Sequence, residues 1–353
     1  MRRAWVAVGL VALGCGPASP SNGTSATTEH LTPSRVVLTQ AQFTPAPNRP
    51  SWLSGFSADD FWFAPSTGGV LRSRHQGLPM RVAELEPSRI GGPLANPIFL
   101  SSGDAFFTVL LANGSQKLVH WKDGSVEDLT VALAGSGTAF ERVADLRRTP
   151  SGEMVALIHA ATDSRHLTFV SWDGRALATG PAFDVPSDLV TWQAVAVSST
   201  QALLLGADRS GLYRMARFDG HALSAAVSLP GQMGSPLMPT GPDAAFIAVD
   251  GMRFWDGKAL SPLSAPPDSP VYLAFAPDGL ASVESDGGAT GYANPRVVIE
   301  HASGGITRFS VGDAGTASSR HWLAAGIAGT TLLVMVDGTA AADPSVVAVD
   351  LRP

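Results

Sequence analysis

The sequence is poor in cysteine. Cys15 is the single cysteine in a chain of 353 residues, so no disulfide framework can form within the chain and no set of paired thiolates can hold a structural zinc ion. We therefore expect the fold to depend on its hydrophobic core alone. Hydrophobic residues make up 45% of the chain, which is enough for a large core or for an array of repeats.

Lysine is scarce as well. Lysine occurs only at Lys117, Lys122 and Lys258, the formal net charge is −6, and no run of basic residues is present. A mildly acidic chain of this kind is a poor match for nucleic acid or for an anionic lipid surface. We therefore expect no nucleic-acid partner.

Long helical patterns are missing after the first fourteen residues. The apolar runs are short, rich in Val, Leu, Phe and Trp, and separated by turns for which 37 Gly and 26 Pro are available. Short runs of β-branched and aromatic residues between such turns are typical of strands. The sequence therefore predicts an all-β protein.

Residues 1–14 have the pattern of a signal peptide. Two arginines precede an apolar run that ends in small residues, and this run is too short to cross a bilayer as a stable helix. The segment Ala12-Leu13-Gly14-Cys15 resembles the lipobox of bacterial lipoproteins, with Gly directly before the cysteine. Its first two residues depart from that motif, so an ordinary signal peptide that happens to contain a cysteine is the alternative.

The lipobox resemblance implies a lipid on Cys15 and attachment to a membrane through it. Several acyl chains on one residue would anchor the protein stably. Residues 15–33 are small and polar, so we expect the lipidated cysteine to be followed by a flexible tether. Gly16 stands where an Asp would retain an enterobacterial lipoprotein in the inner membrane. We therefore expect the protein in the bacterial cell envelope, at the outer membrane or cell surface.

A turn motif recurs through residues 34–353. Its full form is an aromatic residue followed closely by Asp-Gly, in which the Gly accepts the positive φ of a tight hairpin. The copies recur every 37 to 50 residues, which is the length of a β-propeller blade. Full copies end at Gly124, Gly174, Gly220 and Gly257, and weaker ones lie at His75-Gln76-Gly77, His301–Gly305 and Asp350-Leu351.

These copies predict a seven-bladed β-propeller of four-stranded antiparallel blades. We expect each Asp to cap its turn and each aromatic residue to pack on the neighbouring blade. The last repeat is one strand short, and Arg35–Thr39 is a spare strand before the first repeat. This N-terminal strand is expected to pair with the last one and close the propeller, because closure removes exposed strand edges. Six or eight blades stay open as alternatives, since two hairpins are degenerate.

Two sub-patterns resemble known propeller repeats. Phe275–Gly279 and Arg148–Glu153 resemble the inner turn of TolB-like and WD-repeat propellers, and the Trp-Asp-Gly hairpins resemble kelch-like repeats. The double glycine of kelch repeats and the Gly-His and Trp-Asp register of WD repeats are missing. The resemblance covers residues 34–353, but it is to an architecture, and an architecture does not define a function.

Aromatic residues are the first candidates for ligand binding. Each opens the first strand of its repeat, and first strands line the channel of a propeller, so the rings are expected to gather at one channel mouth. Aromatic faces there suit a sugar ring or an apolar ligand. The alternative is that the rings pack between neighbouring blades as core. The candidates are Trp52, Trp192, Tyr272 and Trp322, with His321 beside the last.

Two sets of polar residues have weaker claims. His120, His159 and His166 fall in adjacent repeats, and two of them with an acid would bind zinc, but chance placement is the simpler interpretation. Acids in the loops between second and third strands would bind calcium, yet Asp is also an ordinary turn residue. We predict no metal and no cofactor. The acids concerned are Asp163, Asp208, Asp250, Asp286, Asp337 and Asp343.

No motif for catalysis is recognisable in the sequence. It contains no Gly-x-Ser-x-Gly elbow, no His-Glu-x-x-His and no phosphate-binding glycine loop, so no catalytic residue is predicted. A monomeric binding or scaffold module with an unknown protein or carbohydrate ligand is favoured over an enzyme. The alternative is a hydrolase or lyase that acts on a polysaccharide at the channel mouth.

Overall fold

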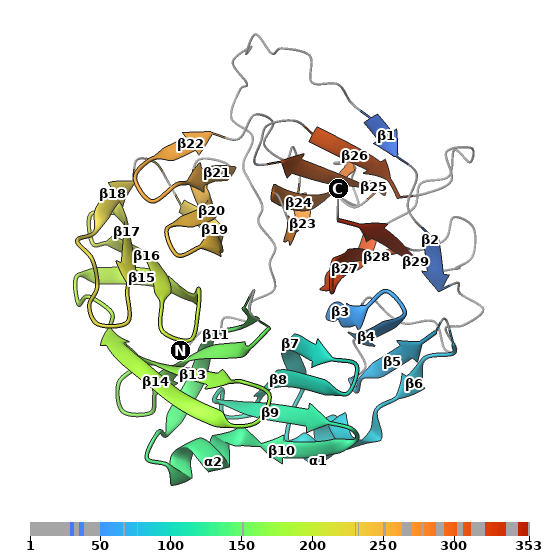
Figure 1. The fold of residues 1–353 in the computed structure, drawn as a ribbon, viewed down its shortest axis with the longest axis horizontal. Coiled ribbons are helices and arrows are strands. Elements are labelled where there is room, and N and C mark those ends of the chain that lie inside the picture. The colour runs from blue at the N-terminus through green and yellow to red at the C-terminus, as the bar shows by residue number, and fades with distance from the viewer. Residues whose placement is uncertain are drawn as a thin grey trace. The chain divides into compact units, whose positions relative to one another are not determined.

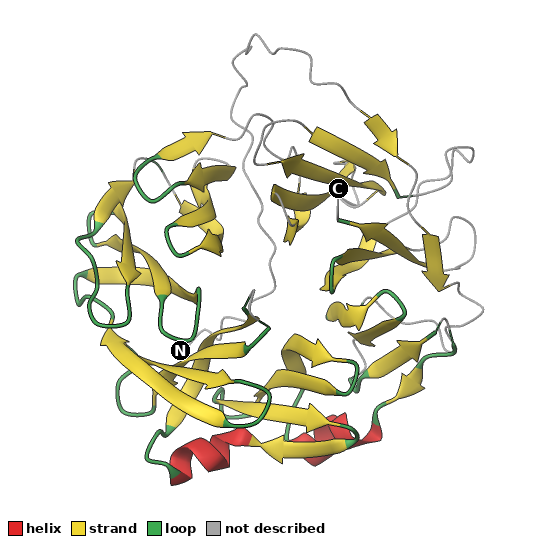
Figure 2. Cartoon of the chain, in the orientation of Figure 1, coloured by secondary structure: helices red, strands yellow, loops and turns green. Residues whose placement is uncertain are grey.

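Strands make up most of the structure, so the protein is all-β as predicted (Figure 2). Within the described ranges three short helices occur, η2 (Ala83–Leu85), α1 (Pro87–Ile90) and α2 (Leu129–Gly135), and no helix is long and apolar enough to cross a membrane. The structure, a computed structural model, describes residues 29–31, 35–38, 50–65, 68–75, 77–149, 152–229, 231, 233–249, 252–262, 270–276, 279–286, 293–301, 306–311, 322–336 and 345–351.

The chain divides into two compact units. The central unit consists of Gly68–Val70 and Arg81–Pro262, and the terminal unit consists of Met1–Thr67, Leu71–Met80 and Leu263–Pro353. Segments from the two ends of the chain therefore belong to one unit. Each unit has its own sheets and cores.

The central unit contains four antiparallel sheets, each built from four consecutive strands in simple sequence order (Figure 1). Each sheet is named by its strands. The strands are β7 (Leu94–Ser101), β8 (Asp104–Leu110), β9 (Gln116–Lys122) and β10 (Ser125–Asp128); β11 (Phe140–Arg148), β12 (Met154–Ala160), β13 (His166–Trp172) and β14 (Leu177–Asp184); β15 (Leu189–Ala196), β16 (Ala202–Asp208), β17 (Tyr213–Phe218) and β18 (Val227–Leu229); and β19 (Met233–Gly241), β20 (Ala244–Val249), β21 (Met252–Trp255) and β22 (Leu260–Pro262).

Neighbouring sheets of the central unit share cores. In three of the four full copies, the aromatic residue before the Asp-Gly turn packs into the core that its sheet forms with the preceding one. Trp172 does so between the β7–β10 and β11–β14 sheets. Phe218 does so between the β11–β14 and β15–β18 sheets, and Trp255 does so between the β15–β18 and β19–β22 sheets. The predicted packing of these residues on a neighbouring blade is confirmed, and four-stranded antiparallel blades of this kind define the fold as an all-β propeller.

Hydrogen bonds from backbone N–H groups to side-chain oxygens also join successive sheets. The N–H of Val143 in β11 donates to Gln116 Oε1 at 2.8 Å, and the N–H of Ala196 in β15 donates to Asp145 Oδ2 at 2.8 Å. The N–H of Leu237 in β19 donates to Gln193 Oε1 at 3.2 Å. In each case a polar side chain of one sheet accepts a hydrogen bond from an N–H in the first strand of the next sheet, which helps to hold the two sheets together.

Three of the four full Asp-Gly turns have the chemistry that the sequence predicts, whereas Asp123 instead adopts a φ of +46° and its side chain caps no N–H of its own turn among the described residues. Asp173 Oδ1 accepts the N–H groups of Arg175 and Ala176 at 2.8 and 2.9 Å, and Asp219 and Asp256 make the same two bonds in their own turns. The following glycines have φ of +96°, +103° and +91°, a region that other residues rarely adopt.

The terminal unit contains two sheets. One has five strands in the order β1 (Glu29–Leu31), β26 (Ile306–Ser310), β25 (Ala293–His301), β24 (Gly279–Asp286) and β23 (Pro270–Ala276). The other has eight, in the order β2 (Arg35–Leu38), β29 (Ser345–Asp350), β28 (Thr331–Val336), β27 (Trp322–Ala328), β3 (Trp52–Ser57), β4 (Asp60–Ala64), β5 (Leu71–Arg74) and β6 (Met80–Arg81).

The N-terminal strand lies where the sequence predicts it. Strand β2 pairs antiparallel with β29, with Arg35 opposite Ala348 and Val36 opposite Val347. The end of the expected tether also contains a strand, because β1 runs parallel to β26. The rest of residues 15–33 lies outside the described residues.

The predicted number of seven separate blades is wrong for the described residues, which form six sheets. The first and last repeats were expected as two blades, but they share the eight-stranded sheet. A parallel bridge between Ala328 of β27 and Gly55 of β3 joins them. This bridge connects positions that are far apart in the chain, and no local sequence pattern predicts it.

Candidate functional site

The side chains of two predicted ligand-binding residues, Trp52 and Trp192, are described. Trp52 is half-buried at the start of β3 in the terminal unit, and Trp192 is half-buried in β15 in the central unit. Tyr272 lies in β23 and Trp322 begins β27, but their side chains are outside the described residues, as are all of His321 and Cys15.

Trp192 lies at the junction of two sheets. Its side chain packs against the core between the β11–β14 and β15–β18 sheets, and its ring centroid lies 5.4 Å from that of His159. The residue opposite on β16 is Gly206, where a Cβ would come 2.7 Å from Leu189 Cδ1 and 3.2 Å from Trp192 Cβ. The glycine therefore leaves room for the Leu189 side chain and for the Cβ of Trp192.

His159, near the end of β12, is held in one tautomer. Its Nδ1 lies 2.6 Å from the carbonyl oxygen of Ser164, and because a carbonyl can only accept, Nδ1 carries the hydrogen and Nε2 is left as an acceptor. Burial lowers the pKa of His159. The Ser164 bond opposes this effect, and the charge of Arg142 lowers the pKa further. The imidazole is therefore neutral near pH 7.

Charged side chains complete this site. Arg142 pairs with His159 across β11 and β12, and Arg142 and its neighbour Glu141 are both exposed. We call Glu141, Arg142, His159 and Trp192 the Trp192–His159 site. It offers an aromatic face, a hydrogen-bond acceptor and a charge of each sign, a combination that suits binding of a polar ring.

The three predicted histidines lie in separate environments. His120 is buried, with Nε2 2.8 Å from Asp104 Oδ1 and its ring stacked on Phe106 at 4.3 Å. His166 Nδ1 lies 2.7 Å from Asp184 Oδ1. No group of three or more His, Cys, Asp or Glu side chains suited to a metal ion occurs in the part of the chain that the structure describes.

The two loop acids whose side chains are described serve their own turns. Asp163 Oδ1 accepts the N–H of Arg165 at 2.8 Å, and Asp208 Oδ1 accepts from both the N–H and the hydroxyl of Ser210. The hydroxyl bond is the main cause that lowers the pKa of Asp208. Asp286 ends β24, but its side chain is outside the described residues. All of Asp250, Asp337 and Asp343 are outside them as well.

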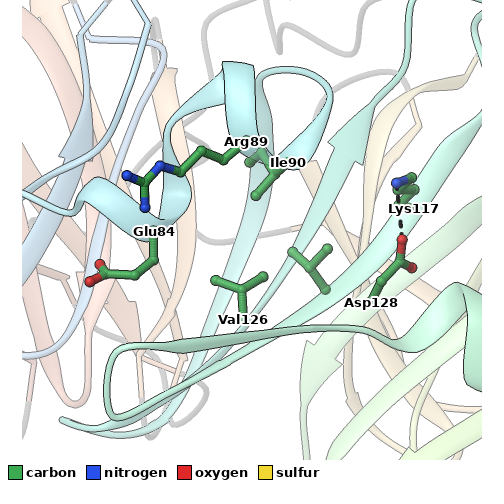
Figure 3. A pocket seen from close by; sticks show the side chains of 7 residues that line it. Glu84, Arg89, Ile90, Lys117, Val126 and Asp128 are labelled. Carbon is green, nitrogen blue, oxygen red and sulfur yellow. Dashed lines mark ion pairs between the residues drawn. The ribbon is translucent and has the colours of Figure 1, made fainter.

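A pocket of about 360 Å³ lies on the β7–β10 sheet (Figure 3). Helix α1 and η2 cover one side of it, and β9 and β10 form the other. Sequence reasoning missed it because the segment between the first two repeats carried no strand pattern. The available signal was Pro87, which stands at the start of α1 and is favoured there. Its lining residues are Glu84, Arg89, Ile90, Lys117, Val119, Val126 and Asp128.

Comparison with known proteins supports the fold only. No protein-family model matches the chain, and no curated protein matches it. Among solved structures it is similar to a puromycin-hydrolyzing peptidase of Mycobacterium tuberculosis, with 16% identity and a TM-score of 0.51 over 86% of this chain. The chain spans 51% of that peptidase, and an architecture shared at this identity carries no activity with it.

Proposed function

We propose that the protein is a binding module whose ligand lies against the Trp192–His159 site. The observation that carries the proposal is the half-buried Trp192 ring beside a neutral His159 with a free Nε2 acceptor. A propeller of four-stranded blades supports a binding or scaffold role. The other predicted contacts, Trp52, Tyr272, His321 and Trp322, stay predictions.

The chemistry of the site favours an acidic sugar. The face of an indole packs well on the C–H face of a sugar ring, and His159 Nε2 can accept a hydrogen bond from a hydroxyl. Arg142 can hold a carboxylate through two parallel hydrogen bonds. A uronic-acid unit of an extracellular polysaccharide would use all three groups.

A thermal-shift assay on residues 16–353 tests this proposal, since that chain lacks the lipid but keeps β1. A uronate oligosaccharide at roughly 100 times its dissociation constant should stabilise the protein by about 2.7 kcal/mol. Trp192→Ala should abolish the shift. Tyr213→Ala is the matched control, because Tyr213 also packs from the same sheet against a core but lies outside the site. An equal ligand shift in both variants would contradict the proposal.

The pH dependence of binding gives a second readout. Protonation of His159 removes the Nε2 acceptor, and the pKa of His159 is lowered from 6.5. Affinity should therefore be constant above pH 6.5 and fall as the pH drops through that lowered pKa. His159→Ala should bind more weakly and lose this component of the pH profile.

We also propose that Cys15 carries a lipid that attaches this module to the outside of a bacterial membrane as a monomer. Mass spectrometry of the protein from a bacterial host should give a mature N-terminus at Cys15 with the mass of bound acyl chains. Cys15→Ser should appear in the soluble extracytoplasmic fraction. A wild-type protein that is soluble and has its mature N-terminus at another residue would contradict this part of the proposal without affecting the ligand site.

A further inference from the structure

The pocket on the β7–β10 sheet has an apolar floor. Val126 and Asp128 of β10 lie opposite Trp121 and Val119 of β9, and strand alternation places Lys117 on the same face as Val119. Val119 is 2% exposed and Val126 is 36% exposed. Ile90 of α1 faces them across the pocket (Figure 3).

One pair of charges in the pocket is already neutralised. Lys117 Nζ lies 3.0 Å from Asp128 Oδ2. The other carboxylate oxygen of Asp128 accepts the N–H of Thr130 at 3.0 Å and so caps α2. This pair forms a fixed polar wall that has little charge left for a ligand.

The other two charged residues are not used in this way. Among the described residues, neither the Glu84 carboxylate nor the Arg89 guanidinium makes an ion pair, although both line the pocket. Two charges of the same segment do pair, since Arg81 Nη1 lies 2.9 Å from Glu86 Oε1. The segment therefore leaves one carboxylate and one guanidinium at the pocket without a partner.

We propose that this pocket binds a small zwitterion with an apolar side chain, such as a free aliphatic or aromatic amino acid or a dipeptide. Glu84 would hold the ammonium group, and Arg89 would hold the carboxylate through its planar fork of donors. The apolar side chain would lie on Ile90, Val119 and Val126. The volume of about 360 Å³ is within the range of small-molecule sites.

Charge balance narrows the ligand class. A simple anion would be repelled by Glu84 and a simple cation would be repelled by Arg89, whereas a zwitterion can place an opposite charge against each. This site lies on a different sheet from Trp192 and does not depend on the function proposed for that residue. Trp192→Ala should therefore leave it unchanged.

Ligand-observed NMR and calorimetry on residues 16–353 test the proposal with leucine and Leu-Leu as probes. We expect saturable binding with a dissociation constant of 1 mM or tighter, on the order of small-ligand sites. N-acetyl-leucine and leucine amide each remove one charge and should bind at least tenfold more weakly, roughly the loss of one charge-assisted hydrogen bond.

Substitutions assign the binding to the pocket. Arg89→Gln should weaken leucine more than leucine amide, and Glu84→Gln should weaken leucine more than N-acetyl-leucine. Arg81→Gln and Glu86→Gln are charge-matched controls from the same segment and should leave affinity unchanged, with unaltered melts showing that all four variants fold. Absence of saturable binding by both probes, or equal binding of the blocked derivatives, would overturn the proposal.

Discussion

Trp172 shows how a single residue joins two sheets. It is 9% exposed, and its ring lies 4.7 Å from the ring of His120 and 5.8 Å from that of Phe106, both on the preceding sheet. Burial of a large aromatic side chain is among the strongest contributions that one residue makes to stability.

Trp172→Ala should therefore destabilise the protein by about 3–5 kcal/mol, because the cavity between the two sheets cannot collapse fully. Denaturant unfolding measures the change. Val131→Ala, at a position that is 69% exposed on α2, is the control and should change stability by less than about 0.5 kcal/mol. A melting temperature lowered by only a degree or two in Trp172→Ala would contradict the interpretation.

The capping aspartates make stability depend on pH in the acid range. Backbone N–H bonds lower the pKa of Asp173, Asp219 and Asp256 below 3.8. The unfolded chain then binds more protons than the folded one between the folded and unfolded pKa values. The stabilisation is complete above about pH 3.8 and is lost as pH falls through the lowered folded pKa values.

Replacing all three by asparagine should keep the caps, because an amide oxygen still accepts both N–H bonds, but should remove the titration. The variant should unfold at nearly the same denaturant midpoint as wild type at pH 7 and should lose less stability between pH 4 and pH 2. Parallel acid limbs in the two proteins would refute the assignment.

These residue roles differ in how far the sequence reveals them. The caps of Asp173 and Asp219 could be predicted, since the bonds span only two or three residues. The environment of His120 could not, because its ring contacts Trp172, which lies far along the chain in another sheet. The pocket at Glu84 and Arg89 was missed for the same reason, as its two walls come from separate elements.

At the scale of elements, β27 and β3 approach unusually closely. A Cβ at Gly326 in β27 would fall on the backbone carbonyl oxygen of Leu53 in β3. The clash would be between a new Cβ and backbone atoms of the paired strand, and backbone atoms cannot rotate away as a flexible side chain can. The junction of the two halves of the eight-stranded sheet therefore requires glycine at this position.

Gly326→Ala should destabilise the protein by more than about 3 kcal/mol or prevent it from folding, since the two strands must separate. Gly135→Ala is the matched control, because a Cβ there has no atom within 4 Å and the residue ends α2. The control should be as stable as wild type. Soluble yield and denaturant midpoint compare the two, and equal values would show that β27 and β3 can move apart freely.

The strands themselves were largely predictable, and the short helices were not. Runs such as Met154–Ala160 and Thr331–Val336 are apolar, β-branched in part and bounded by turns. Helix α2 has only seven residues, which is too short for a hydrophobic period to emerge. Its start is marked by Asp128, whose side chain accepts the N–H of Thr130.

At the scale of the whole molecule, the pairing of β2 with β29 joins the two ends of the chain. Val36→Pro combined with Val37→Pro would remove two backbone N–H groups from β2. N–H groups of neighbouring residues in a strand point to opposite sides, so at least one of the two faces β29. We expect a loss on the order of 1 kcal/mol for the hydrogen bond removed, and self-association through the opened edge of β29. The Thr/Thr double variant keeps both N–H groups and is the control.

Size-exclusion chromatography over a range of concentrations and a thermal melt measure both effects. A proline variant that melts like the threonine control would mean that β2 contributes nothing to the sheet. The pairing could be predicted because the last repeat is one strand short. The number of sheets could not, because it depends on one bridge between Ala328 and Gly55.

The same pairing sets an order of events during synthesis. Residues 39–344 lie between strand β2 and its partner β29, so all of this intervening chain must be made before the two strands can pair. Contacts between such distant segments form slowly because a long loop must close first. Until then the chain carries an incomplete sheet whose open edges can pair with other chains.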